Sequence, residues 1–145
     1  MIITGGKYII TDPCYLFKSD EEWQELCNEY FGKGDNGGVI NYEGYKIFWS
    51  VTHHGDGSYE TFVNGIRKGL VGVDAGLLAA IPFELAKKLA QGFLDSDNED
   101  VYIETNLTTG VFVPCDKEGL IHFSNATVET GWLEDDEDED IEEEF

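Results

Sequence analysis

Apolar and polar residues alternate along several short stretches of the chain, and this period of two is typical of β-strands with one buried face. The first stretch, 7–11, ends at Asp12-Pro13. Two later stretches meet at Glu43-Gly44, which predicts a β-hairpin there. An apolar run over 70–81 is interrupted by Asp74-Ala75-Gly76. The remaining predicted strands are 39–42, 45–52, 58–63, 101–105, 111–115, 120–124 and 127–130.

Two other stretches have the period of an amphipathic helix. The first begins at Ser19, and apolar residues recur at the first, fourth, fifth and eighth positions counted from Trp23. Ser19 with Glu22 three residues later has the pattern of a capping box. The second helix is expected to begin at Pro82, which suits a first helical turn, and to end near Gly92.

About seven to nine short strands and two helices predict an α+β fold. The alternation favours a mostly antiparallel sheet that is strongly curved or barrel-like. Trp23 and Trp49 lie in periodic segments and are expected to pack in the core. Residues 1–133 form one predicted domain, and 134–145 form an acidic C-terminal tail.

Negative charge dominates the composition and is unevenly distributed. The 145 residues include 30 acidic and 9 basic ones, a formal net charge of −21. Ten of the last twelve residues are acidic, and residues 1–133, with 20 acidic and 9 basic residues, still carry −11. Such a chain repels phosphate, which argues against conventional nucleic-acid binding.

The cysteines indicate a reducing compartment. Their number is odd and their spacing shows no C-x-x-C pair, which favours free thiols in the cytoplasm. No apolar run approaches the roughly 20 residues of a membrane span, and the first residues lack the layout of a signal peptide. We therefore expect a cytoplasmic protein with no membrane partner.

Three turns place carboxylates beside apolar segments, and these are the candidate sites for chemistry. If Asp12, Asp56 and Asp74 converge, they could act as acid and base or hold a divalent cation. Cys14 with His53 or His54 would offer a thiolate–imidazole pair instead. The favoured interpretation is simpler, because Asp in such turns commonly accepts hydrogen bonds from nearby backbone amides. No metal or cofactor is assigned.

The string DPCY at 12–15, a tryptophan in the next helix, GDGSY at 55–59 and GVDAGL followed by IP within 72–82 form a composite pattern. This pattern resembles that of small uncharacterised phage and bacterial proteins. The resemblance covers residues 8–82 and implies a related fold and a phage-like origin. That family has no established activity, so the resemblance implies no mechanism.

The favoured hypothesis for function is a non-enzymatic, acidic binding protein. It would be a phage-encoded inhibitor, anti-defence or host-takeover, that occupies the nucleic-acid-binding surface of a basic host protein by charge mimicry. The partner would be met in the host cytoplasm, without direct contact to nucleic acid. The expected binding carboxylates are Asp20, Glu21, Glu22, Glu25, Asp95, Asp97, Glu99, Asp100, Glu134, Asp135, Asp136, Glu137, Asp138, Glu139 and Asp140.

Two other hypotheses remain. The first is a small enzyme or a ligand- or metal-binding module that uses Asp12, Cys14, His54, Asp56 and Asp74. It requires these residues to meet in one pocket, although 62 positions separate Asp12 from Asp74. The second is a structural component of a virion. The sequence leaves the oligomeric state and the sheet topology open.

Overall fold

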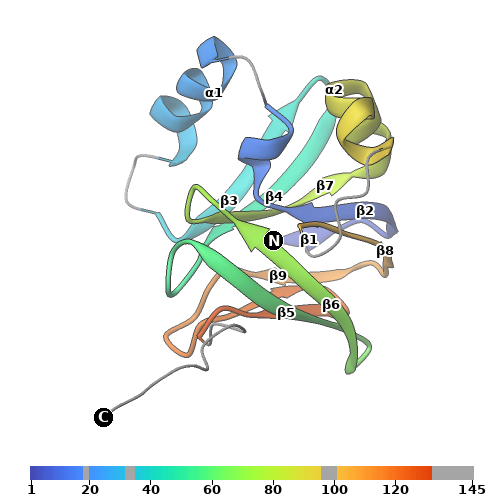
Figure 1. The fold of residues 1–145 in the computed structure, drawn as a ribbon. Helices are drawn as coiled ribbons and strands as arrows, with labels where there is room; N and C mark the ends of the chain where they lie inside the picture. The colour runs from blue at the N-terminus through green and yellow to red at the C-terminus, as the bar shows by residue number, and fades with distance from the viewer. Residues whose placement is uncertain (18–19, 32–34, 96–100, 132–145) are drawn as a thin grey trace.

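The chain has an α+β fold in which two α-helices accompany two antiparallel sheets (Figure 1). The computed structural model describes residues 1–17, 20–31, 35–95 and 101–131. Helix α1 (Asp20–Leu26) continues as a π-helical turn over Cys27–Phe31, and helix α2 spans Phe83–Asp95. A short 3-10 helix covers Pro13–Tyr15. Within these ranges, no helix has both the length and the apolar character needed to cross a membrane.

Eleven strands are described, and they form two open sheets. The five-stranded sheet has the order β3-β4-β7-β2-β8, and the six-stranded sheet has the order β1-β9-β10-β11-β5-β6. In chain order the strands are β1 (Ile2–Ile3), β2 (Gly6–Thr11), β3 (Gly37–Tyr42), β4 (Tyr45–Val51), β5 (Gly57–Val63), β6 (Ile66–Val73), β7 (Leu77–Pro82), β8 (Ile103–Leu107), β9 (Gly110–Val113), β10 (Leu120–Phe123) and β11 (Ala126–Glu129).

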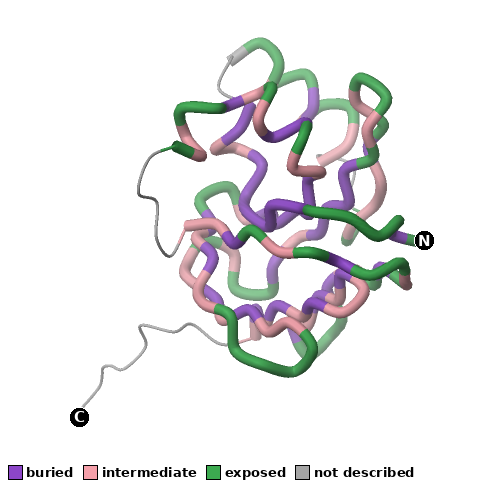
Figure 2. Tube along the Cα trace, turned by 90° about the vertical axis from the view of Figure 1, so that its right-hand side faces the viewer, coloured by how far each residue is buried: buried purple, intermediate pink, exposed green. Residues whose placement is uncertain are grey.

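The five-stranded sheet is the middle layer of three. Figure 1 shows both helices on one side of it and the six-stranded sheet on the other. Tyr8 and Ile10 of β2 pack into the core between the sheets, whereas Ile9 packs into the core under the helices. Leu78 and Ala80 of β7 likewise face the other sheet. In Figure 2 the buried segments accordingly run through the middle of the molecule.

Burial on both faces explains the composition of β7, which is apolar at nearly every position rather than alternating. Its two alanines are fully buried and are paired across the sheet with large aromatic residues of β4. Ala79 lies opposite Trp49, and Ala80 lies opposite Phe48. The small side chains leave room for the neighbouring rings, so large and small residues fill the two layers together.

The expectation of a strongly curved or barrel-like sheet is wrong, because neither described sheet is closed or strongly curled. Short alternating strands with frequent turn signals are common to barrels and to stacked open sheets, so that pattern does not separate them. The distinguishing signal is the continuous apolar run Leu77–Pro82. A strand of a small closed barrel has one face outward, whereas this strand has both faces covered.

Several local predictions are confirmed, with shifted boundaries. The hairpin at Glu43-Gly44 joins β3 to β4, and both turn residues have positive φ angles, 50° and 84°. The first helix is present, although its last five residues are π-helical and Ser19 lies outside the described residues. Pro82 does not begin the second helix; it is the last residue of β7 and is paired with Tyr8.

The two tryptophans predicted to be in the core are there. Trp49 is 3% exposed in the core under the helices, and Trp23 of α1 is half-buried against the same core. Trp132 lies outside the described residues.

Leu78→Ala tests the layered packing, because Leu78 is fully buried between the sheets. We expect the free energy of unfolding to fall by about 3 kcal/mol, as is usual for a large-to-small change in a core. Urea denaturation followed by tryptophan fluorescence measures it. The control Ile66→Ala removes a side chain that is 72% exposed, and should change stability by less than about 0.5 kcal/mol. Equal losses in the two variants would contradict the packing described.

Candidate functional site

The carboxylate of Asp12 connects the end of β2 to the turn between β6 and β7. Asp12 is fully buried. Its Oδ1 accepts a hydrogen bond from the backbone amide of Cys14 at 2.9 Å. Its Oδ2 accepts from the amides of Asp74 at 3.0 Å and Ala75 at 2.6 Å. We call this group of four residues the Asp12 junction.

Local chemistry explains one half of the Asp12 junction. Asp12 is the N-cap of the 3-10 helix, and Pro13 follows it at the first position. Proline has no N–H, so Cys14 provides the first amide that needs an acceptor. The predicted role of Asp12 in a turn is therefore confirmed. The second carboxylate oxygen makes a contact that turn chemistry does not predict, because it reaches residues 62 and 63 positions away.

Burial governs ionisation at the Asp12 junction. It raises the pKa of Asp12, and the amide hydrogen bonds offset part of that rise because they stabilise the carboxylate. Burial, followed by the charge of Asp12, also raises the pKa of the Cys14 thiol well above its usual range. The Cys14 thiol therefore stays protonated at neutral pH, which makes it a poor nucleophile.

A pocket of about 420 Å³, here called the polar pocket, opens beside the β6–β7 turn. Asp56 and Asp74 both line it, and the Tyr15 hydroxyl donates to Oδ2 of Asp74 at 2.8 Å. The Tyr15 ring stacks on Phe93 of α2, with 5.7 Å between ring centroids. The other lining residues are Gly57, Ser58, Gly72, Val73 and Val101. Two of the candidate carboxylates thus share one pocket, and Asp12 holds the backbone of one of them.

His54 lies apart from this pocket. Its Nε2 is 2.7 Å from the carbonyl oxygen of Gly131, in the turn that follows β11. Within the described ranges no hydrogen bond joins His54 to Cys14. The same ranges contain no group of three or more His, Cys, Asp or Glu residues positioned to hold a metal ion.

Most of the described part of the predicted acidic surface lies on α1. Glu21, Glu22 and Glu25 are exposed there, and the hydroxyl of Tyr42 at the end of β3 donates to Glu22 at 2.7 Å. The pKa of Tyr42 is raised to about 12, first by this hydrogen bond and then by burial and by the charges of Glu22, Glu43 and Glu25. Carboxylates from a helix and from a hairpin turn therefore converge on one phenol. We call Glu21, Glu22, Glu25 and Glu43 the acidic face.

The other predicted acidic residues are placed only in part. Asp20 begins α1, and Asp95 is the exposed last residue of α2, where it accepts a hydrogen bond from Gln91 at 2.9 Å. The following lie outside the described residues: Asp97, Glu99, Asp100, Glu134, Asp135, Asp136, Glu137, Asp138, Glu139 and Asp140.

Sequence reasoning missed three site residues, and two of them are defined by contacts distant in sequence. Tyr15 reaches Asp74 across 59 positions, and Tyr42 reaches Glu22 across 20. Glu43 was predicted only as a turn residue. The presence of Tyr15 in the DPCY string was the one available signal for any of them.

Comparison with known proteins adds nothing to this geometry, since no family model, curated protein or solved structure matches the chain.

Asp12→Asn tests the Asp12 junction. An asparagine side chain has only one acceptor oxygen. Its NH2 group must therefore point at the backbone N–H of Cys14 or at those of Asp74 and Ala75, and two donors cannot bond to each other. We expect the free energy of unfolding to fall by about 1–3 kcal/mol, the usual result of leaving buried donors unsatisfied. Urea denaturation measures this loss, and hydrogen exchange should show faster exchange at the amides of residues 74 and 75.

Asp56→Asn is the matched control for Asp12→Asn, because Asp56 lies in the same region but is exposed. Its effect on stability should stay within about 0.5 kcal/mol. If Asp12→Asn were as stable as Asp56→Asn, with unchanged exchange at residues 74 and 75, the structural role of Asp12 would be refuted.

Titration of Tyr42 tests the acidic face. Loss of the phenolic proton would place a second negative charge beside Glu22, so ionisation is shifted upward to about pH 12. Glu22→Gln removes the facing charge, and we expect the pKa of Tyr42 to fall. NMR of the ring carbons resolves this tyrosine from the other six. Glu84→Gln, on α2, should leave the pKa of Tyr42 unchanged; a Glu22→Gln variant that does the same would show that the carboxylates do not converge.

Proposed function

We propose that the protein is a non-enzymatic acidic binding protein that engages the basic, nucleic-acid-binding surface of a partner by charge mimicry. The observation that carries this proposal is the group of exposed carboxylates that forms the acidic face, where Glu22 accepts a hydrogen bond from Tyr42, on a chain whose net charge is −21. A surface that concentrates carboxylates has the same sign of charge as a phosphate backbone. The basic groove of a partner protein can therefore bind it in place of nucleic acid.

The distribution of cations supports the proposal. Three basic side chains form ion pairs elsewhere in the described chain: Lys7 with Glu104, Arg67 with Glu60, and Lys87 with Glu84. For Glu21 and Glu25, the described residues provide no cation within 4 Å. The negative field of the acidic face is therefore not cancelled by these pairs.

The placement of the acidic face on α1 also supports binding to a macromolecule. Helix α1 forms part of the outer layer and contributes Leu26 and Trp23 to the core beneath it, so its backbone is anchored. Exposed carboxylates on an anchored helix keep a fixed spacing, which a complementary basic surface can match. Charge of this kind accelerates association by steering, and the effect weakens as salt rises.

The biological form of the proposal is a phage-encoded inhibitor, anti-defence or host-takeover, that acts in the cytoplasm of a bacterial host. It follows from the resemblance of the DPCY, GDGSY and VDAG strings to small phage and bacterial proteins, together with the charge. The partner would be a basic host protein that ordinarily binds nucleic acid.

A ligand-binding module is the second candidate function. One observation favours it: Asp56 and Asp74 line the same polar pocket, where Tyr15 bonds to Asp74. Catalysis by Cys14 is disfavoured because burial keeps that thiol protonated.

The test is affinity capture from bacterial lysate with the tagged full chain. We expect a nucleic-acid-binding protein to be captured at about 0.1 M salt and lost towards about 1 M, where the Debye length falls from about 10 to about 3 Å. The combined variant Glu21→Gln, Glu22→Gln, Glu25→Gln should capture much less of it. A control with the same net charge, Glu84→Gln, Glu104→Gln, Glu118→Gln, should retain capture.

Two results would refute charge mimicry by the acidic face. One is the absence of any retained partner at either salt concentration. The other is equal loss of capture in both triple variants, which would mean that total charge matters and its placement on α1 does not. Capture that survives the α1 triple variant but is lost in Asp56→Asn, Asp74→Asn would assign binding to the polar pocket instead.

A further inference from the structure

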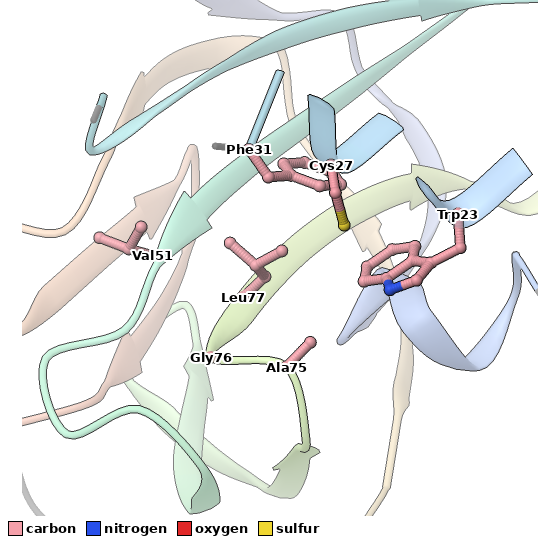
Figure 3. A pocket seen from close by; sticks show the side chains of 7 residues that line it. All are labelled: Trp23, Cys27, Phe31, Val51, Ala75, Gly76 and Leu77. Carbon is pink, nitrogen blue, oxygen red and sulfur yellow. The ribbon is translucent and has the colours of Figure 1, made fainter. Parts of the chain in front are cut away.

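A second pocket lies along the same β6–β7 turn, between α1 and the ends of β4 and β7 (Figure 3). Its volume is about 400 Å³. The side chains that line it are uncharged and mostly apolar: Trp23, Cys27, Phe31, Val51, Ala75, Gly76 and Leu77. We call it the apolar pocket.

The π-helical turn shapes the wall of the apolar pocket. Trp23, Cys27 and Phe31 are spaced four residues apart, and in a regular α-helix this spacing drifts around the axis. The wider turn over Cys27–Phe31 reverses that drift, so all three side chains face the same space. The Trp23 and Phe31 ring centroids are 5.6 Å apart, and Phe31 packs edge-on against Trp49 at 4.9 Å.

The floor and rim of the apolar pocket are held in place by buried groups. Leu77 at the start of β7 is 7% exposed and packs in the core under the helices. The amide of Ala75 donates to Asp12 at 2.6 Å, which fixes the rim. Figure 3 shows the Cys27 sulfur and the Trp23 ring directed toward the space beside Leu77. The pocket is thus formed before any ligand arrives.

Two polar side-chain groups reach this apolar lining. The Trp23 indole N–H has no acceptor among the described residues. In Figure 3 its nitrogen is on the side of the ring nearer Ala75. The Cys27 thiol is the other group; burial, followed by the charge of Asp12, raises its pKa, so it is neutral at neutral pH. The lining therefore provides one strong donor, the indole N–H, beside a weakly donating thiol, and no charge.

We propose that the apolar pocket binds a small uncharged ring compound that carries one hydrogen-bond acceptor for the Trp23 indole N–H. Its volume falls within the range of about 300–1,000 Å³ that is usual for such sites. An anion would be repelled by the Asp12 charge and by the net charge of the chain, and a cation would find no carboxylate in the lining. This proposal does not depend on the proposed function.

Protection of Cys27 from a maleimide reagent tests the proposal in the full-length protein. Acetophenone, a ring with one carbonyl acceptor, should slow modification of Cys27 by about tenfold once its concentration exceeds its dissociation constant about tenfold. Mass spectrometry of peptides measures Cys14 in the same sample. Cys14 is also partly exposed but does not line the pocket, so its rate should be unchanged. Benzoate and benzylammonium test charge, and neither should protect Cys27.

Two variants test the geometry. Ala75→Phe places a ring in the pocket and should abolish protection by acetophenone, with the fold verified by circular dichroism. Trp23→Phe keeps an aromatic wall but removes the indole N–H. In this variant, acetophenone should protect Cys27 no better than cumene does, a similar ring compound that lacks an acceptor.

Three results would overturn the proposal. The first is that acetophenone protects Cys27 no more than Cys14, or protects neither. The second is that benzoate protects Cys27 as strongly as acetophenone does. The third is that Trp23→Phe still prefers acetophenone over cumene to the same extent. Protection of Cys27 that grows with protein concentration in the absence of a probe would also overturn it, because the occupant would then be a second copy of the chain.

Discussion

The rest of the structure depends on the burial of the five-stranded sheet on both faces. Its strand β7 is apolar throughout and has no exposed side for polar residues, so the polar groups of the candidate sites lie at strand ends and in turns. Asp12 follows β2, and the Asp74–Gly76 turn precedes β7, which is hydrogen-bonded to β2. Both described pockets lie along that turn. Layered packing therefore determines where chemistry can occur.

Within the described ranges, backbone amides and not a lysine or arginine stabilise the buried Asp12 carboxylate. Three backbone amides surround the Asp12 carboxylate, so the scarce lysines and arginines are not needed there. The carboxylate keeps its negative charge, and this charge, after burial, contributes to raising the pKa of both the Cys14 and the Cys27 thiols. An uncharged molecule suits the apolar pocket, and a basic macromolecule suits the acidic face. These are separate surfaces with separate chemistry.

Patterns within one element were predictable, and contacts between elements were not. Alternation identified β3, β4 and their hairpin, and Asp-Pro identified the turn at Asp12. Stacked open sheets were mistaken for a curved sheet because strand length and turn spacing are alike in both. The bond from Asp12 to Ala75 depends on the pairing of β2 with β7, which no local signal encodes. Phe31 joins Trp23 only because the helix widens into a π-turn.

Charge mimicry requires that this protein and nucleic acid compete for one surface. The most direct measurement is a titration of the full chain into a complex of the captured host protein with fluorescently labelled duplex DNA. The predicted result is displacement of the DNA, with one molecule of this protein bound to each molecule of the partner. The displacement should weaken as the salt concentration rises. A stable ternary complex, in which the DNA stays bound while this protein binds as well, would contradict charge mimicry.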